Sequence, residues 1–305
     1  MDQKPQVIIL MGPTATGKTG WAVRLAQKIN GEIVSADSRQ VYRSMDIGTG
    51  KDLEEYGPIP YHLIDIVDAG EEFSVSDFQR LAWQALEEIN GRNLHPIICG
   101  GTGHYIKALI DDYKFVEGKT DLSKSAKLEE ESREHLEIRI KDLNLWDQHH
   151  WRSDSKRRMA RAIEKAVSAS GSQSALPRFS DCFDYRIYYI ELDRETIKAN
   201  IYRRLVERLE HGMIEEVKKL IETGISHNRL ERYGLEYRYI SYYLRGHLSY
   251  SDCLKKLHVE ISRFAKRQMT FIRYMQKSGH HLEAVSSYQM FERSILNWLL
   301  SNKGE

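Results

Sequence analysis

The sequence lacks several features that would assign it to a special class of protein. It has no long apolar run, so we expect no membrane-spanning helix. An apolar strand begins within its first residues, which leaves no room for a signal peptide. Its three cysteines are scattered without C-x-x-C spacing, which argues against a disulfide framework and a zinc site. Together these absences predict a cytoplasmic protein.

Other absences narrow the range of functions. The formal net charge is only +1, so any nucleic-acid surface must be local rather than a property of the whole chain. The sequence has no repeat of solenoid length, no guanine-reading N-K-x-D motif and no kinase catalytic-loop signature. A chain of 305 residues can form a full core, and we expect two domains or one domain with an insertion.

The strongest positive signal is Gly12–Thr19, which matches the phosphate-loop pattern G-x-x-x-x-G-K-[ST]. The apolar run Val7–Met11 before it predicts a buried strand, and the spacing of Trp21–Ile29 predicts a helix. In this setting backbone amides converge on a phosphate, the Lys18 ammonium reaches the outer phosphate, and the Thr19 hydroxyl can hold Mg²⁺. The motif predicts phosphate binding but not which compound is bound.

Two further segments are expected at the same edge of the sheet. A strand over Glu32–Ser35 leads to Asp37, and a strand over Pro96–Cys99 leads to a second glycine-rich turn that contains Thr102. The carboxyl ends of neighbouring parallel strands face the ligand crevice. Asp37 is therefore placed either for chemistry or as the cap of a turn, and His104 either for catalysis or for packing.

Two weaker signals lie between these segments. Asp46–Lys51 is a glycine-rich loop with a cation, a pattern that is usual in turns. His62–Ile66 reads as a short strand that contains Asp65. Asp65 is either a Walker-B-like acid near Mg²⁺ or a solvated strand-end carboxylate, and the pattern leaves both interpretations open.

The pattern as a whole predicts an α/β fold. We expect a P-loop NTPase-like parallel sheet flanked by helices, with a helical insertion and a helical C-terminal region. The C-terminal helices interleave basic and aromatic residues, which is typical of an RNA-binding surface and also of a charged helix with buried aromatics. The predicted parts are a core over 1–112, a mainly helical insertion over 113–184, a return to the core over 185–225 and the helical C-terminal region over 226–305.

Taken together, these segments resemble the tRNA dimethylallyltransferase (tRNA isopentenyltransferase) family. The matching segments occur in the family's order at 12–19, 35–43, 45–49, 61–65, 100–109, 157–162 and 265–270. Members of the family transfer a dimethylallyl group from dimethylallyl diphosphate to N6 of the adenosine immediately 3′ of the anticodon in tRNA. The resemblance therefore implies a prenyltransferase that is a monomer, with Mg²⁺, dimethylallyl diphosphate and the tRNA anticodon stem-loop as its cofactor and partners.

The resemblance also implies a role for individual residues. The phosphate loop would bind the diphosphate of the prenyl donor rather than ATP through Gly12, Pro13, Thr14, Ala15, Thr16, Gly17, Lys18 and Thr19, with Thr19 as the metal residue. Asp37 would be the general base, with Lys18 and Arg204 as catalytic cations on the diphosphate. The tRNA-binding residues would be Asp37, Ser38, Arg39, Gln40, Thr102, Arg157, Arg158 and Arg161, and the insertion and the C-terminal region would form the tRNA surface.

The sequence departs from the family pattern at His104, at Gly50–Asp52, at Asn200 and at Phe271–Ile272. None of these departures touches the phosphate-loop lysine or the expected general base. Three other functions stay open: a P-loop small-molecule kinase that uses ATP, an adenylate isopentenyltransferase that acts on free nucleotides, and a non-enzymatic RNA-binding protein.

Overall fold

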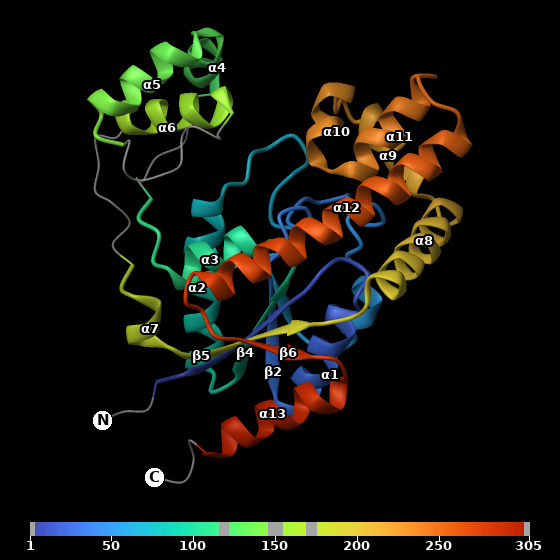
Figure 1. The fold of residues 1–305 in the computed structure, drawn as a ribbon. Coiled ribbons are helices and arrows are strands. Elements are labelled where there is room, and N and C mark those ends of the chain that lie inside the picture. Colours follow the sequence, from blue (N-terminus) through green and yellow to red (C-terminus); the bar gives the residue numbers. More distant parts are fainter. Residues whose placement is uncertain (1–3, 116–121, 146–154, 169–175, 302–305) are drawn as a thin grey trace. The chain divides into compact units, whose positions relative to one another are not determined.

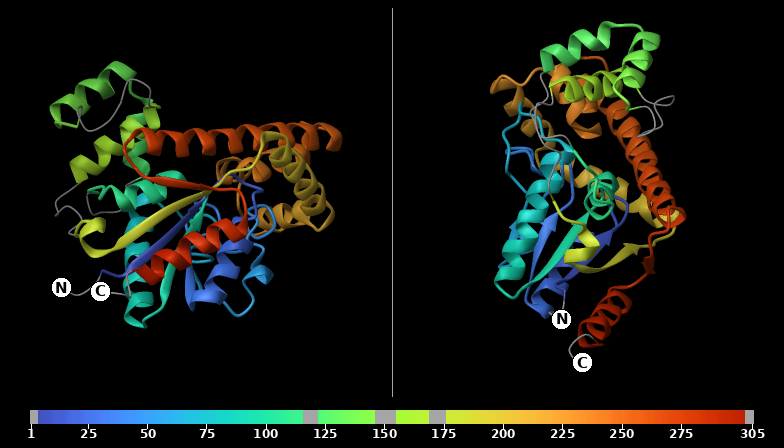
Figure 2. Two further views of the ribbon diagram at one scale, coloured as in Figure 1. Left: turned by 60° about the horizontal axis from the view of Figure 1, so that its bottom comes forward. Right: turned by 90° about the vertical axis from the view of Figure 1, so that its left-hand side faces the viewer.

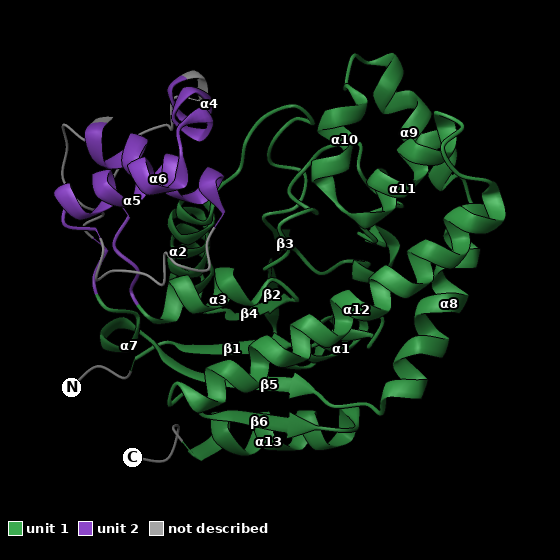
Figure 3. Ribbon diagram, turned by 45° about the horizontal axis from the view of Figure 1, so that its top comes forward, with its two compact units in different colours: residues 1–111, 178–305 green, residues 112–177 purple. Residues whose placement is uncertain are grey.

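The computed structural model describes residues 4–115, 122–145, 155–168 and 176–301 (Figure 1). The chain divides into two compact units, one made of residues 1–111 and 178–305 and the other of residues 112–177 (Figure 3). In the described ranges, no helix is long and apolar enough to cross a membrane.

The larger unit is built on one parallel sheet. Its strands in the described chain are β1 (Gln6–Met11), β2 (Gly31–Ser35), β3 (Tyr61–His62), β4 (His95–Gly100), β5 (Asp184–Ile190) and β6 (Leu282–Val285), in the order β3-β2-β4-β1-β5-β6. Met11 pairs with Gly100, and Ser35 pairs with Cys99. The segments that follow β1, β2 and β4 therefore begin at the same edge of the sheet, as the sequence predicts.

Helices surround this sheet, which confirms the predicted fold class. They are α1 (Lys18–Ile29), α2 (Val75–Gly91), α3 (Gly103–Ile110), α7 (Phe179–Cys182), α8 (Arg194–Glu210), α9 (Met213–Glu222), α10 (His227–Tyr233), α11 (Leu235–Leu244), α12 (Tyr250–Lys277) and α13 (Tyr288–Ser301), with a 3-10 turn η1 (Leu53–Tyr56). The long helix α12 runs from α11, past α8, to α3 (Figures 1 and 2). Ser74 caps α2 in a capping box with Asp77, and Asp193 caps α8.

Two of the apolar clusters in the described part of the larger unit bear on the position of the loops at the edge of the sheet. In the first, α1 and α13 pack on the sheet, where Trp21 stacks on Phe291 with ring centroids 6.0 Å apart. In the second, helices α8 to α12 pack around one another and onto Val41, Tyr42 and Met45. The loop that follows β2 is thus part of the core of the C-terminal helices, which fixes its position at the edge of the sheet.

Two of the predicted elements are wrong in part. The expected strand over His62–Ile66 ends at His62, because Leu63 and Asp65 adopt left-handed backbone conformations that leave the extended path. The region after 226 is not wholly helical, because Leu282–Val285 forms β6 beside β5. Four residues are too few for a periodic pattern to distinguish a strand from a turn. Residues 168–177 are rich in serine and other small residues, which predicts a loop, and they lie largely outside the described residues.

The smaller unit is helical in its described part. It contains α4 (Leu122–Glu130), α5 (Arg133–Asp142) and α6 (Lys156–Ser168). Leu136 and Ile140 of α5 pack against Met159 and Ile163 of α6. The arginines at 157, 158 and 161 all lie on α6, where the apolar residues that alternate with them form the core of the unit.

Candidate active site

A cavity of about 370 Å³ lies at the carboxyl edge of β1, β2 and β4. It brings together three segments that the sequence places at this edge, because parallel strands deliver their following turns to one side of a sheet. Nine of the predicted site residues line it: Thr14, Lys18, Thr19, Asp37, Ser38, Arg39, Gln40, Thr102 and Arg204. The remaining loop residues Gly12, Pro13, Ala15, Thr16 and Gly17 shape the turn behind this lining.

The phosphate loop carries its lysine at the first position of α1. The Lys18 ammonium donates to the carbonyl oxygen of Pro13 at 2.7 Å, and the hydroxyl of Thr16 donates to the same oxygen at 2.9 Å. The pKa of Lys18 is lowered to about 8, chiefly by burial; Cys99 and Asp37 act to raise this pKa, and Arg204 acts to lower it. A cation that has lost its water in this way favours an anionic ligand.

Helix α8 contacts the phosphate loop at Thr14 and Ala15. The Arg204 guanidinium donates to the Thr14 hydroxyl at 2.7 Å, and the Asn200 amide donates to the carbonyl oxygen of Ala15 at 3.2 Å. Burial and the neighbouring Arg208 lower the pKa of Arg204 to about 10, so it stays charged at neutral pH. Two cations therefore face the cavity beside the N-terminus of α1, an arrangement that suits a phosphate group.

Asp37 both closes a turn and lines the cavity. Its Oδ1 accepts a hydrogen bond from the Arg39 backbone N–H at 2.8 Å, which closes a turn. Among the described residues its second oxygen has no hydrogen-bond partner, and Asp37 lines the cavity. The backbone N–H of Ser38 donates to the Thr102 hydroxyl at 3.1 Å, which ties this turn to the second glycine-rich turn. Both interpretations of Asp37, turn cap and chemical group, are thus compatible.

The buried Gln40 side chain contacts two segments at the carboxyl edge of the sheet. Its side-chain oxygen accepts from the Ser35 hydroxyl at 2.9 Å, and its amide donates to the Gly50 carbonyl oxygen at 3.0 Å. Gln40 thereby joins the end of β2 to the loop over residues 46–50. His104 packs against Phe271 of α12 with the two rings tilted by 57° and their centroids 4.6 Å apart, which supports a packing role.

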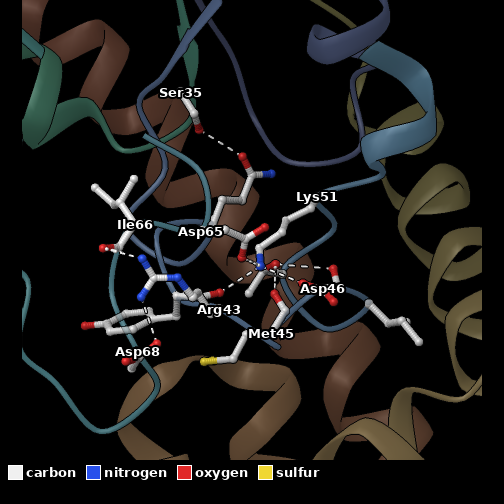
Figure 4. A network of polar contacts seen from close by, with 12 residues as sticks. Ser35, Arg43, Met45, Asp46, Lys51, Asp65, Ile66 and Asp68 are labelled. Carbon is white, nitrogen blue, oxygen red and sulfur yellow. Dashed lines mark hydrogen bonds and ion pairs between the residues drawn. The ribbon is translucent and has the colours of Figure 1, made fainter. Parts of the chain in front are cut away.

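Asp65, for which the sequence leaves two interpretations open, does not line the cavity. Its carboxylate binds the ammonium of Lys51, which is fully buried (Figure 4). The same ammonium donates to Asp46 at 2.6 Å and to the carbonyl oxygen of Tyr42 at 2.7 Å. Because β3 ends at His62, Asp65 does not project from a strand end into the cavity. The interpretation of Asp65 as a Walker-B-like acid is therefore wrong.

Glu216 of α9 also anchors the loop over residues 46–50, and no pattern in the sequence indicates this contact. Its carboxylate accepts from the backbone N–H groups of Asp46, Ile47 and Gly48 at 2.7 to 3.0 Å, and from the Tyr237 hydroxyl at 2.7 Å. A carboxylate with several donors of this kind fixes a loop more firmly than neutral contacts do. The loop that supplies Gly48, Thr49 and Gly50 to the cavity wall is thus held from both sides.

The departure from the family pattern at Gly50–Asp52 has a structural explanation. Arg208, buried one turn after Arg204, forms an ion pair with Asp52 at 3.1 Å and lines the cavity. A β-carbon on Gly50 would lie 1.9 Å from an Arg208 nitrogen.

Glu236 also lines this part of the cavity. Burial raises the pKa of its carboxyl group, and the positive charges of Arg208 and Arg204 offset part of this increase.

We expect Gly50→Ala to destabilise the protein by about 1–3 kcal/mol, because φ at this position is +66° and the new methyl group displaces Arg208. Urea unfolding measures the change in free energy. Gly246→Ala is the matched control, since Gly246 has a φ of +72° with nothing within 4 Å of an added β-carbon. An equal loss in both variants would contradict the steric role of Gly50.

The described residues of this site offer few protein ligands to a divalent metal ion. Within the described ranges, no group of three or more histidine, cysteine, aspartate or glutamate residues is arranged to hold a metal ion. Thr19 lines the cavity beside Lys18 and offers a hydroxyl oxygen. Mg²⁺ commonly binds through few protein groups together with phosphate oxygens and water, so this lining fits a metal that arrives with a phosphorylated ligand.

The chain is similar to known prenyltransferases in sequence. A family model described as IPP transferase matches residues 40–275, and one described as isopentenyl transferase matches residues 5–56. The tRNA dimethylallyltransferase 1 of Azobacteroides pseudotrichonymphae is 43% identical over 293 residues, which cover 94% of this chain and 95% of that protein.

Two solved structures are similar over almost the whole chain. The tRNA isopentenylpyrophosphate transferase of Staphylococcus epidermidis is 31% identical with a TM-score of 0.71, over 98% of this chain and 100% of that one. A eukaryotic dimethylallyltransferase acting on tRNA is 25% identical with a TM-score of 0.76, over 98% of this chain and 80% of that one. The phosphate loop, the Asp37 turn and this similarity lead to one conclusion: the chain belongs to the IPP transferase family.

Proposed function

We propose that this chain transfers a dimethylallyl group from dimethylallyl diphosphate to N6 of the adenosine immediately 3′ of the anticodon in tRNA, with release of diphosphate. One observation carries the proposal: the Asp37 carboxylate lines the same cavity as the phosphate loop, Lys18 and Arg204. The relatives named tRNA dimethylallyltransferase support the same reaction.

The donor half of the cavity suits the leaving group. As the allylic C–O bond breaks, positive charge develops on carbon and negative charge on the departing diphosphate. Lys18, Arg204 and the backbone amides at the start of α1 supply fixed positive charge where that anion grows, and each such donor is worth about 3–4 kcal/mol. Mg²⁺ held by Thr19 and the diphosphate oxygens would neutralise part of the same charge.

The acceptor half needs a base, because the adenine N6 lone pair is delocalised and attacks poorly. The second carboxylate oxygen of Asp37 takes a proton from N6 as the new C–N bond forms. The adenine must leave its stack to reach the cavity, which costs a few kcal/mol and less in an unpaired anticodon loop. Ser38, Arg39, Gln40 and Thr102 lie beside Asp37 and would surround the adenine.

One assay tests the proposal against the other functions. The protein is incubated with labelled dimethylallyl diphosphate or labelled ATP, together with an anticodon stem-loop RNA, AMP or ADP. We expect label from the prenyl donor on the RNA only. Label from ATP on a small acceptor would indicate a kinase, and prenyl label on AMP or ADP would indicate an adenylate isopentenyltransferase. Either result without labelled RNA would contradict the proposal.

The pKa of Lys18 predicts a pH dependence. The burial-lowered pKa is about 8, so Lys18 loses its charge as the pH rises through 8. Because only the charged form attracts diphosphate, we expect kcat/KM for the donor to be constant from about pH 7 to about pH 8 and then to fall about tenfold per pH unit. Lys18→Arg stays charged and should lack this decline. A decline of the same shape in Lys18→Arg would assign it to another group.

Helix α6 is proposed to bind the RNA backbone. Arg157→Ala and Arg161→Ala should each weaken RNA binding and lower the slope of log affinity against log salt concentration by about 1. Filter binding of the stem-loop at several salt concentrations measures both quantities. Lys127→Ala on α4 removes the same charge from an exposed position in the same unit and serves as the control. An equal loss in the control would show a general charge effect rather than contacts on α6.

A further inference from the structure

Gln268 of α12 connects the two glycine-rich turns of the cavity. Its side-chain oxygen accepts from the backbone N–H of Thr14 at 2.8 Å, and its side-chain amide donates to the carbonyl oxygen of Gly101 at 3.0 Å. One amide thus bonds the turn after β1 and the turn after β4. Both turns supply residues to the cavity wall, and Gln268 lines the cavity itself.

Helix α12 packs closely against the second turn at two of its glycines. A β-carbon on Gly101 would lie 2.3 Å from the Gln268 amide nitrogen, and one on Gly103 would lie 2.2 Å from the ring of Phe271. Real β-carbons essentially never approach heavy atoms so closely, so a methyl group at either glycine would have to displace the Gln268 amide or the Phe271 ring. Gly101 and Gly103 of this turn therefore lie directly against side chains of α12.

The contact between Gln268 and Thr14 also holds part of the phosphate loop. The Thr14 backbone N–H is directed to Gln268, while the Thr14 hydroxyl is held by Arg204 of α8. Thr14 of the phosphate loop is therefore held by α12 through its backbone N–H and by α8 through its side-chain hydroxyl. A loop that is already in its binding conformation loses less conformational entropy when it takes up an anion.

We propose that Gln268 is a positioning residue that holds the phosphate loop in the conformation that binds the donor diphosphate. The identity of the donor rests on the proposed function, but the role of Gln268 requires only that a diphosphate occupies the loop. Gln268 acts through Thr14 and need not touch the reacting atoms. Its loss should therefore weaken diphosphate binding more than it slows the transfer of a bound donor.

Gln268→Met tests this role, because methionine has a similar length and lacks both hydrogen bonds. We expect the Kd for inorganic pyrophosphate with Mg²⁺, measured by calorimetry, and the KM for the prenyl donor to rise about tenfold, with kcat and the KM for RNA within about twofold. Gln276→Met, at an exposed position on the same helix, should leave all four unchanged. Wild-type pyrophosphate binding by a folded Gln268→Met variant would overturn the proposal.

A double-mutant cycle separates this role from general destabilisation. Gly101→Ala pushes the Gln268 amide aside and should raise the Kd for pyrophosphate by about the same factor as Gln268→Ala. In the Gln268→Ala background the added methyl group has nothing to displace, so it should change the Kd by less than about twofold. Effects that multiply independently would overturn the proposal. Because pyrophosphate binding requires no acceptor, this result stands whether or not the chain prenylates tRNA.

Discussion

Asp37→Asn should lower kcat for prenyl transfer by about 10²- to 10⁴-fold, the usual contribution of a general base. The asparagine side-chain oxygen can still accept from the Arg39 backbone N–H, so the turn that Asp37 closes is preserved. What is lost is the oxygen that takes the N6 proton, because an amide is not a base at neutral pH. Single-turnover rates at saturating donor and stem-loop RNA measure the effect on the chemical step.

Binding measurements complete this test. The Kd values for pyrophosphate and for the stem-loop RNA should stay within about twofold of wild type in Asp37→Asn, since the loss falls on the transition state. Asp37→Ala, which loses the turn as well as the base, should in addition be less stable to urea. If Asp37→Asn kept more than a tenth of the wild-type kcat, Asp37 would not be the base.

Lys51→Met should destabilise the fold by about 3 kcal/mol, near the lower end of the cost of breaking a buried ion pair. The Lys51 side chain is 0% exposed, and its ammonium compensates Asp46 and Asp65 and binds the Tyr42 carbonyl oxygen (Figure 4). The two carboxylates are 56% and 33% exposed, so water can replace part of what they lose. The free energy of urea unfolding measures the loss.

A surface lysine provides the control for this prediction. Lys28→Met removes an ion pair with Glu292 at 3.4 Å from a side chain that is 53% exposed, and should cost no more than about 1 kcal/mol. Lys51→Met should also reduce activity, because the loop anchored by Lys51 and Glu216 carries Gly48, Thr49 and Gly50 into the cavity. Equal stability losses in the two variants would mean that the buried network contributes nothing beyond a surface pair.

Features of the site that are encoded in a few consecutive residues are predictable from the sequence. The phosphate loop, the turn at Asp37 and the turn at Thr102 each occupy a few consecutive residues after an apolar strand. Once those strands are parallel neighbours, their turns must meet at one edge. The sequence also placed Arg204 in the site, but only through the resemblance to a family, since nothing in the spacing of α8 distinguishes it from its neighbouring arginines.

Local patterns encode the α/β class, the phosphate site and the candidate base, so these features are predictable from the amino-acid sequence. The side chains that support them depend on how distant segments pack in three dimensions. Asp65 turns away to Lys51 because the backbone leaves the strand at Leu63, which no periodicity predicts. Gln268 reaches Thr14 across 254 residues of sequence, and Glu216 reaches the loop over 46–48 from a separate helix. Such contacts depend on how whole helices pack, and residue spacing along the chain does not specify that packing.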